Sequence, residues 1–217
     1  MRTVILVQIV LAVSLMAQNK PPQLLQIVRE RVKAGSENGY DAIEDERARA
    51  CAEFKCPHPV LALEPLNGPK EVWWLNSFLS ETDRQRVTNA YARNGPLMAA
   101  FQRTSGPKAN VVGTSSDLVL RYRPELSRTR WDLAGMRFLV VTAAQGSVLP
   151  DGTAFEAPDG TRLVLHPAKT RLEAERLASA APGETTVLGV RPSWGFPAKE
   201  WIDADPRFWV LNPAVRP

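Results

Sequence analysis

Residues 60–78 read VLALEPLNGPKEVWWLNSF, and this stretch decides the fold. Two apolar runs, 60–66 and 71–78, are separated by the turn sequence NGPK. Asn-Gly between apolar runs is the strongest short-range signal for a β-hairpin, because these residues accept the backbone angles of a tight turn. Both faces of each run carry apolar side chains, so we expect the C-terminal half, another subunit or a ligand to cover the second face.

A strand and a helix are predicted before the hairpin. Residues 23–33 alternate in the manner of a strand, and the sequence AGS at 34–36 ends it. From Ser36 the apolar positions recur at helical spacing as far as Phe54, and Pro57 and Pro59 follow. Glu44 and Arg47 belong to a mixed-charge run that indicates a solvated helix face.

A second helix and a strand are predicted after the hairpin. Ser80 and Asp83 have the spacing of a capping box, and the sequence NGP at 94–96 is expected to kink or divide the helix that they begin. After Gly106 and Pro107, residues 117–123 are typical of a strand. The order β-α-β-β-α-β is the ferredoxin-like arrangement.

The second half is predicted to be a shorter variation on the same pattern. We expect strands over 137–142 and 186–191, a hairpin over 154–166, and a helix that begins at the capping box of Thr170 and Glu173. The Pro-rich tail carries Trp194, Trp201 and Trp209, which either line a groove or, as we favour, pack onto the sheet.

The fold class predicted is therefore α+β, with the two sheets packed in a barrel-like manner. A ferredoxin-like domain spans 19–126, and a degenerate second α+β half spans 132–217.

The first eighteen residues predict export. Arg2 precedes an apolar run over 4–16 that is too short to cross a bilayer as a helix, and the small residue Ala17 follows. Cleavage near residue 17 or 18 would leave no membrane span and a periplasmic or secreted protein, and an uncleaved anchor is the alternative. In that compartment Cys51 and Cys56, the two cysteines of the chain, are expected to form a disulfide. We expect no metal, because Cys51, Cys56 and His58 lack a fourth ligand at a suitable spacing.

The charge pattern and the missing motifs exclude several functional classes. The net charge is +4 and the basic residues are interspersed with acidic ones, so we expect no nucleic-acid partner. The chain has no G-x-S-x-G, phosphate loop, H-E-x-x-H or dinucleotide fingerprint. The two histidines, His58 and His166, each precede a proline, which is typical of strand edges and turns.

Residues 23–123 resemble the dimeric α/β-barrel superfamily, which includes NIPSNAP-like proteins and the antibiotic-biosynthesis and haem-degrading monooxygenases. The segments IVRERVK at 27–33 and GPKEVWW at 68–74 carry the resemblance. In those monooxygenases an Asn and a Trp in the cavity between the sheets orient an aromatic substrate or haem.

The resemblance implies a set of candidate catalytic residues in this chain. Trp74 and Asn76 lie two apart on one strand and share a face, and Tyr122 or Arg121 and Glu64 are candidates to join them. In the alternative interpretation, Trp73 and Trp74 fill the interface between the sheets and Asn76 bonds to backbone.

Two functional hypotheses follow. The first is an exported, non-catalytic protein, without a cofactor, that binds a partner or a small apolar or aromatic ligand at a barrel-like cavity or at a homodimer interface. The second is a cofactor-independent or haem-linked monooxygenase of the dimeric α/β-barrel type. A cavity lined by Trp74 and Asn76 favours the enzyme, whereas an interior filled by side chains favours the binding or structural role.

Overall fold

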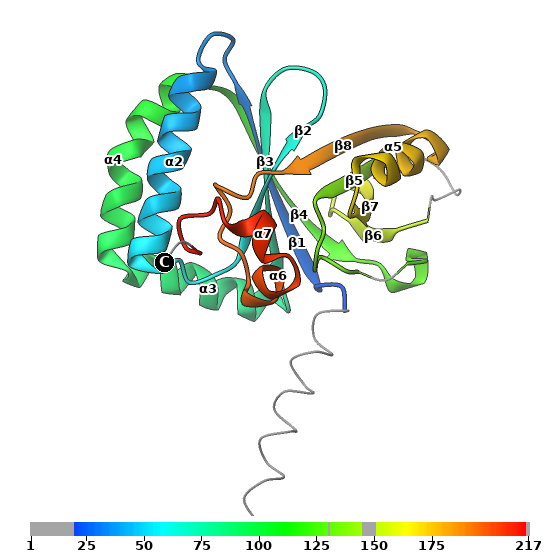
Figure 1. Cartoon of the computed structure of the whole chain (residues 1–217). Helices are drawn as coiled ribbons and strands as arrows, with labels where there is room; N and C mark the ends of the chain where they lie inside the picture. Colours follow the sequence, from blue (N-terminus) through cyan, green and yellow to red (C-terminus); the bar gives the residue numbers. More distant parts are fainter. Residues whose placement is uncertain (1–19, 130, 145–150, 216–217) are drawn as a thin grey trace, which may run out of the picture.

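A closed barrel of eight antiparallel strands organises the part of the chain that the computed structural model describes, residues 20–129, 131–144 and 151–215. Around the barrel the strands follow the order β1-β3-β2-β8-β5-β7-β6-β4 (Figure 1). The predicted α+β class and barrel-like packing are confirmed. The predicted signal segment, residues 1–18, lies outside the described residues.

The two halves of the chain each contribute four strands. The elements of the first half are β1 (Leu24–Val32), α2 (Glu37–Phe54), β2 (Val60–Pro65), β3 (Glu71–Phe78), α3 (Glu81–Arg93), α4 (Gly95–Val111) and β4 (Val112–Tyr122). The elements of the second half are the 3-10 turn η1 (Pro124–Leu126), β5 (Phe138–Ala143), β6 (Thr153–Glu156), β7 (Arg162–Ala168), α5 (Arg171–Ala180), β8 (Glu184–Val190), α6 (Lys199–Ala204) and α7 (Pro206–Trp209).

Helix caps form where the sequence predicts them. The Ser80 hydroxyl accepts a hydrogen bond from the Asp83 amide at 3.0 Å at the start of α3, and Thr170 does the same for Glu173 at 3.2 Å in α5. Asn94 ends α3 and also caps α4, so the predicted helix is divided at this residue. The element order of the first half is therefore β-α-β-β-α-α-β.

The strand predicted over 117–123 begins too late. Helix α4 continues through Gly106 and Pro107, and β4 begins at Val112. Pro107 is exposed, so its ring points away from the core, while Thr104 and Lys108 on the other face of α4 are buried. Burial on that face holds the helix together across a proline that ordinarily breaks one.

Two seams join the halves. Strand β2 pairs with β8 over three residues, from the pair Leu63 and Val190 to the pair Pro65 and Leu188. Strand β4 pairs with β6 over only two residues, and an ion pair between Arg123 and Glu156 reinforces this second seam. The second half of the same chain therefore covers the apolar face that the hairpin sequence leaves open.

Buried side chains fill the barrel interior. Trp73 contributes from β3 and is 5% exposed, and Leu120, Phe155 and Leu188 are fully buried. Trp131 packs edge-on against Phe155, with ring centroids 5.4 Å apart. Because strand residues alternate between faces, Trp74 and Asn76 point to the outer side of β3.

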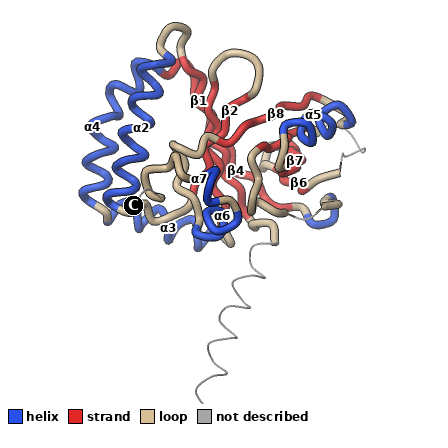
Figure 2. The backbone as a smooth tube through the Cα atoms, in the orientation of Figure 1, coloured by secondary structure: helices blue, strands red, loops and turns tan. Residues whose placement is uncertain are grey.

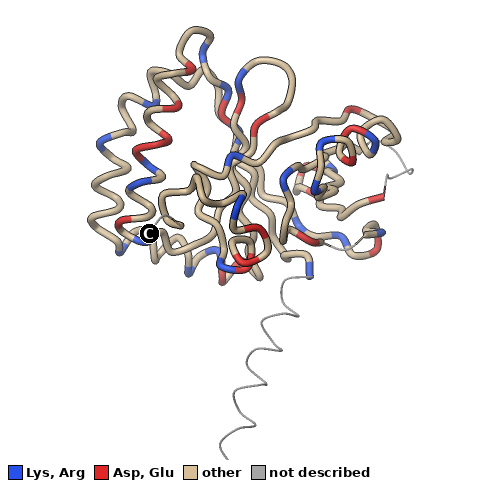
Figure 3. The backbone as a smooth tube through the Cα atoms, viewed as in Figure 1, with Lys and Arg blue, Asp and Glu red and all other residues tan. Residues whose placement is uncertain are grey.

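Helices cover the outer face unequally in the two halves. Helices α2 and α4 run side by side over the first half, and α5 covers the outer face of β5, β7 and β8 through Val140, Ala168 and Ala174 (Figure 2). Acidic and basic residues are interspersed over the barrel and the helices, as Figure 3 shows.

The tail packs onto the barrel and onto α2, as predicted for its aromatic residues. Trp209 is 2% exposed and stacks with Trp201, at a centroid distance of 6.3 Å, beside the barrel core. Trp194 is 3% exposed, and its indole N–H donates to Asp45 of α2 at 2.8 Å. At the end of α2, Cys51 and Cys56 lie at disulfide distance, with their sulfurs 2.01 Å apart.

Candidate functional site

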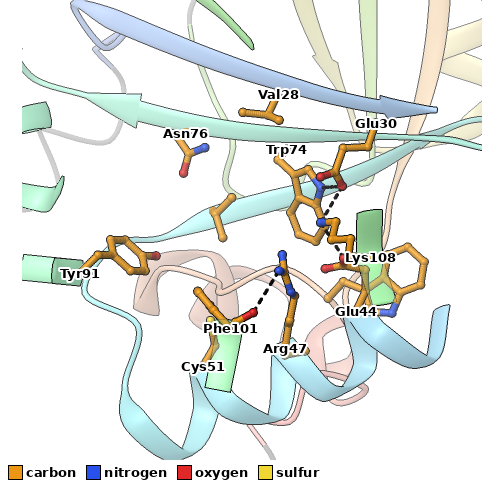
Figure 4. Close-up of a pocket in the computed structure, with 13 residues that line it drawn as sticks. Val28, Glu30, Glu44, Arg47, Cys51, Trp74, Asn76, Tyr91, Phe101 and Lys108 are labelled. Carbon is orange, nitrogen blue, oxygen red and sulfur yellow. Dashed lines mark hydrogen bonds and ion pairs between the residues drawn. The ribbon is translucent and has the colours of Figure 1, made fainter. Parts of the chain in front are cut away.

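A cavity of about 360 Å³ lies between the outer face of the first-half sheet and helices α2 and α4 (Figure 4). Strands β1, β2 and β3 form one wall, and the two helices form the opposite wall. Trp194 of the tail also lines the cavity. The residues that line it are Val28, Glu30, Glu44, Arg47, Ala48, Cys51, Val60, Trp74, Asn76, Tyr91, Phe101, Lys108 and Trp194. Its volume lies at the lower end of the range for small-molecule sites, about 300 to 1,000 Å³.

The walls are mostly aromatic and aliphatic. Trp74 from β3, Phe101 from α4 and Tyr91 from α3 present ring surfaces to the cavity, and Val28 and Val60 add aliphatic surface. Flat aromatic walls with a few polar groups suit a flat, largely apolar molecule.

A buried cluster of charged residues closes one end of the cavity. The Lys108 ammonium lies 2.8 Å from a carboxylate oxygen of Glu30 and 2.8 Å from one of Glu44. Glu30 also accepts hydrogen bonds from the Tyr40 hydroxyl at 2.6 Å and the Trp74 indole at 3.0 Å. Lys108 is therefore shared by two carboxylates, and Glu30 accepts more hydrogen bonds than Glu44 does.

The two carboxylates titrate in opposite directions. Burial is the largest influence on Glu30 and raises its pKa, but the Lys108 charge and the bonds from Lys108, Tyr40 and Trp74 together hold that pKa below its usual value. Burial dominates at Glu44, which is 2% exposed, and raises its pKa despite Lys108 and Arg47. Glu44 is thus the carboxyl that takes up a proton first.

Two polar groups at the other end of the cavity have no hydrogen-bond partner within the described residues. They are the Asn76 side-chain amide and the Tyr91 hydroxyl, which Figure 4 places on the side away from Lys108. Burial raises the pKa of Tyr91 to about 12, so the hydroxyl remains protonated and can donate. Neither group is fully buried, and both are free to bond to a polar group of a molecule in the cavity.

The structure brings together two of the five candidate residues, and Arg121 is exposed on β4. Trp74 and Asn76 line this cavity, which lies between sheet and helices and not between the two sheets. Tyr122 lies on the opposite face, beside Phe155 and the barrel core, at a centroid distance of 5.8 Å. Glu64 on β2 is ion-paired with Lys70 at 3.3 Å and with Arg191 at 3.4 Å.

Sequence reasoning missed the charged end of the cavity. The prediction that Glu44 belongs to a solvated helix face is wrong, because it is among the most deeply buried polar residues. Tyr40, Glu44, Arg47 and Cys51 follow one another at helical intervals of three or four residues, and that spacing is a signal that they share a face. Their partner Lys108 is far away in sequence and could not be paired with them by spacing.

His58, which the sequence offered as a metal ligand, packs against an aromatic ring. His58 stacks on Phe78 with centroids 4.7 Å apart, and burial lowers its pKa. In the described ranges no cluster of three or more His, Cys, Asp or Glu residues is arranged to hold a metal ion. No helix among the same residues has the length and apolar character needed to span a membrane.

The sequence matches no protein-family model and no curated protein. The structure is similar to that of a "putative monooxygenase" of Fusobacterium nucleatum, with a TM-score of 0.51 and 10% identity over 78% of this chain and 93% of that chain. A NIPSNAP family protein of Agrobacterium tumefaciens has a TM-score of 0.37 and 16% identity over 46% of this chain and 93% of its own. A "putative monooxygenase" of Lactobacillus acidophilus has a TM-score of 0.43 and 7% identity over 79% and 94%.

The alignment with the Fusobacterium protein extends over both halves of the barrel, because it covers 78% of this chain. At 10% identity the similarity concerns the fold alone. The chain shares the fold of that protein, and both halves of its closed eight-stranded barrel are supplied by one polypeptide.

Proposed function

We propose that the chain is an exported, non-catalytic binding protein that holds a small, largely apolar aromatic molecule in the cavity between sheet and helices. The observation that carries this proposal is the cavity itself, in which ring surfaces surround two polar groups, Asn76 and Tyr91, that lack partners. We also propose that the protein is exported and that residues 19–126 form a ferredoxin-like domain.

The proposed ligand site lies on the outer face of the sheet and not in the barrel interior. Leu25, Leu63 and Leu139 are among the fully buried residues of the interior cluster, so side chains occupy the space between the two sheets. Both walls of the outer cavity come from one chain. The site therefore requires no second copy of the protein.

A specific observation also favours the oxygenase as a second candidate. Trp74 and Asn76, the pair that the resemblance singles out, line the same cavity. A cofactor-independent reaction there would convert an activated methylene and dioxygen into a ketone and water. The substrate supplies all the electrons, two C–H bonds are broken, and one oxygen atom enters the product.

Binding is tested with the full chain and a neutral aromatic probe, 2-acetonaphthone, by titration calorimetry. We expect saturable binding that is lost in Ala48→Phe, because Ala48 lines the cavity and is 4% exposed. Ala42→Phe, at an exposed position of the same helix, is the matched control and should bind normally. Binding that survives Ala48→Phe would place the ligand elsewhere.

The two candidate functions are separated by oxygen uptake. Under air with an anthrone substrate, the binding protein should leave dioxygen unchanged. Stoichiometric consumption that is lost in Asn76→Ala would establish the oxygenase. Export is tested separately by mass spectrometry of protein from its native host, in which we expect a mature start near Gln18.

A further inference from the structure

Arg47 is the cation of the cavity that has no carboxylate partner within the described residues. Its guanidinium donates from Nε to the Thr104 hydroxyl at 2.8 Å and from Nη2 to the Phe101 carbonyl at a long 3.5 Å. A guanidinium has five N–H groups, so three remain without an acceptor among these residues. Lys108, by contrast, is committed to two carboxylates.

The free side of this guanidinium faces the space that a ligand would occupy. Figure 4 shows it directed from α2 into the cavity, toward Trp74 and between the charged end and the Asn76 end. The Arg47 side chain is half-buried, and its guanidinium carbon lies 5.3 Å from the centre of the Phe101 ring. A guanidinium next to aromatic surface binds a carboxylate in a forked geometry more strongly than it would in open water.

The charges around Arg47 allow it to accept an anion. Glu44 faces Lys108 from α4, Glu30 from β1, and Tyr40 and Arg47 on its own helix. With both carboxylates ionised, the group of Glu30, Glu44 and Lys108 carries one negative charge, which Arg47 balances. Once Glu44 holds a proton, that group is neutral and the positive charge of Arg47 is uncompensated.

We propose that the molecule held in this cavity is a small aromatic acid, whose carboxylate binds Arg47 while its ring lies against Trp74 and Phe101. This inference rests on the proposed ligand-binding function and names the chemical class of its ligand. The Asn76 amide and the Tyr91 hydroxyl are available for a second polar group at the far end of the ring. Binding of the anion is accompanied by proton uptake at Glu44, because the two negative charges compete for the same guanidinium.

The experiment compares two probes of similar shape, 2-naphthoate and 2-acetonaphthone, on the full chain by titration calorimetry. We expect naphthoate to bind about tenfold tighter, the factor that one charge-assisted hydrogen bond supplies. Arg47→Met should remove this preference, so that the variant binds the two probes with affinities within about twofold of each other. Saturable binding of 2-acetonaphthone by this variant, at whatever affinity, shows that it keeps a folded cavity. Arg49→Met, at an exposed position two residues along α2, is the matched control and should keep the preference.

Measuring the affinities at several pH values tests whether Glu44 takes up a proton when the anion binds. Between about pH 8 and pH 5.5 an aromatic carboxylate of ordinary pKa, about 4, stays ionised. The naphthoate affinity should rise as the pH falls over this range, whereas that of 2-acetonaphthone stays constant. Glu44→Gln, which mimics the protonated form, should flatten the naphthoate profile.

The outcomes distinguish this inference from the proposed function. If 2-acetonaphthone binds as tightly as naphthoate, or if Arg47→Met keeps the preference for naphthoate, the acid assignment is overturned and the aromatic cavity stands. A pH profile that Glu44→Gln leaves unchanged overturns the coupling to Glu44. If a folded chain binds neither probe, the proposed function itself is overturned, and the acid assignment with it.

Discussion

Trp73 and Trp74 are neighbours in sequence with different structural roles. Trp73 is 5% exposed in the barrel core, and its indole donates to Glu71 at 2.7 Å. Trp74 is half-buried on the outer face and lines the cavity. That the two rings lie on opposite faces was predictable from strand alternation. Which face carries the cavity was not, because it depends on how α2 and α4 pack.

Replacing each tryptophan by alanine should separate core from site. Trp73→Ala removes a buried aromatic residue and one of the three donors to Glu71, which keeps Arg29 and Arg31, so we expect a loss of about 3 to 5 kcal/mol of unfolding free energy. Trp74→Ala should cost less, because part of its ring already faces a cavity, but it should weaken binding of 2-acetonaphthone. Urea denaturation and calorimetry measure the two effects. Equal losses of stability would contradict the assignment of Trp74 to the site.

Glu44 should make stability depend on pH. Burial raises its pKa in the folded chain, so its contribution to stability is present below the ordinary value and is lost as the pH rises through the raised value. Glu30 behaves oppositely: its pKa is lowered, and its contribution is lost as the pH falls through that lowered value. Glu44→Gln should therefore gain stability relative to the natural chain between about pH 4 and pH 8.

Urea denaturation at the two ends of this pH range measures the difference. Glu46→Gln, at an exposed position on the same helix, is the control and should show a smaller change. A Glu44→Gln effect that is the same at both pH values would contradict a raised pKa at Glu44.

At the scale of elements, signals between residues close together in sequence predicted strand β3 and two helix caps correctly. The β3 bounds agree with the sequence prediction, and the Ser80 and Thr170 caps form as expected, because a cap needs only residues three positions apart. The start of β4 was predicted too late, because α4 continues through Pro107, where burial of the opposite helix face overrides a local stop signal, and β4 begins at Val112. The burial of Glu44 on α2 could not be predicted locally, because its partner Lys108 lies on α4.

The cysteine pair links the end of α2 to the chain that enters β2. Cys51 lines the cavity and Cys56 is buried, so we expect a disulfide to hold the wall of the site as well as the helix end. The closed loop is short, and its reduction should cost only about 2 kcal/mol of stability. Urea denaturation with and without reductant measures this loss. Thiols in the isolated protein that react with iodoacetamide before any reduction would contradict the disulfide.

At the scale of the whole molecule, the sequence showed that the sheet needs a cover but left three alternatives for what covers it. The structure selects the second half of the chain, joined to the first through β2–β8 and β4–β6. Separate strand signals could not predict these seams, because register between distant strands depends on how both halves close.

Removal of the second half should therefore expose the inner face of the first. A chain that ends at residue 126 loses β5 to β8 and uncovers Leu61, Leu63 and Trp73, which lie in the shared core. We expect it to associate with itself, as a dimer or larger species, whereas the full chain has this face covered. Light scattering after gel filtration measures the mass. A stable, folded monomer of the truncated chain would contradict the interdependence of the halves.

The unequal helix cover of the two halves has a consequence for stoichiometry. A barrel built from two identical subunits repeats every surface, so each outer face carries the same site and the sites can act cooperatively. Here α2 and α4 enclose a cavity on the first half, whereas the outer face of β5, β7 and β8 packs against α5. The cavity lined by Trp74 occurs once in each barrel, and its titration should follow a simple hyperbola with one ligand per chain.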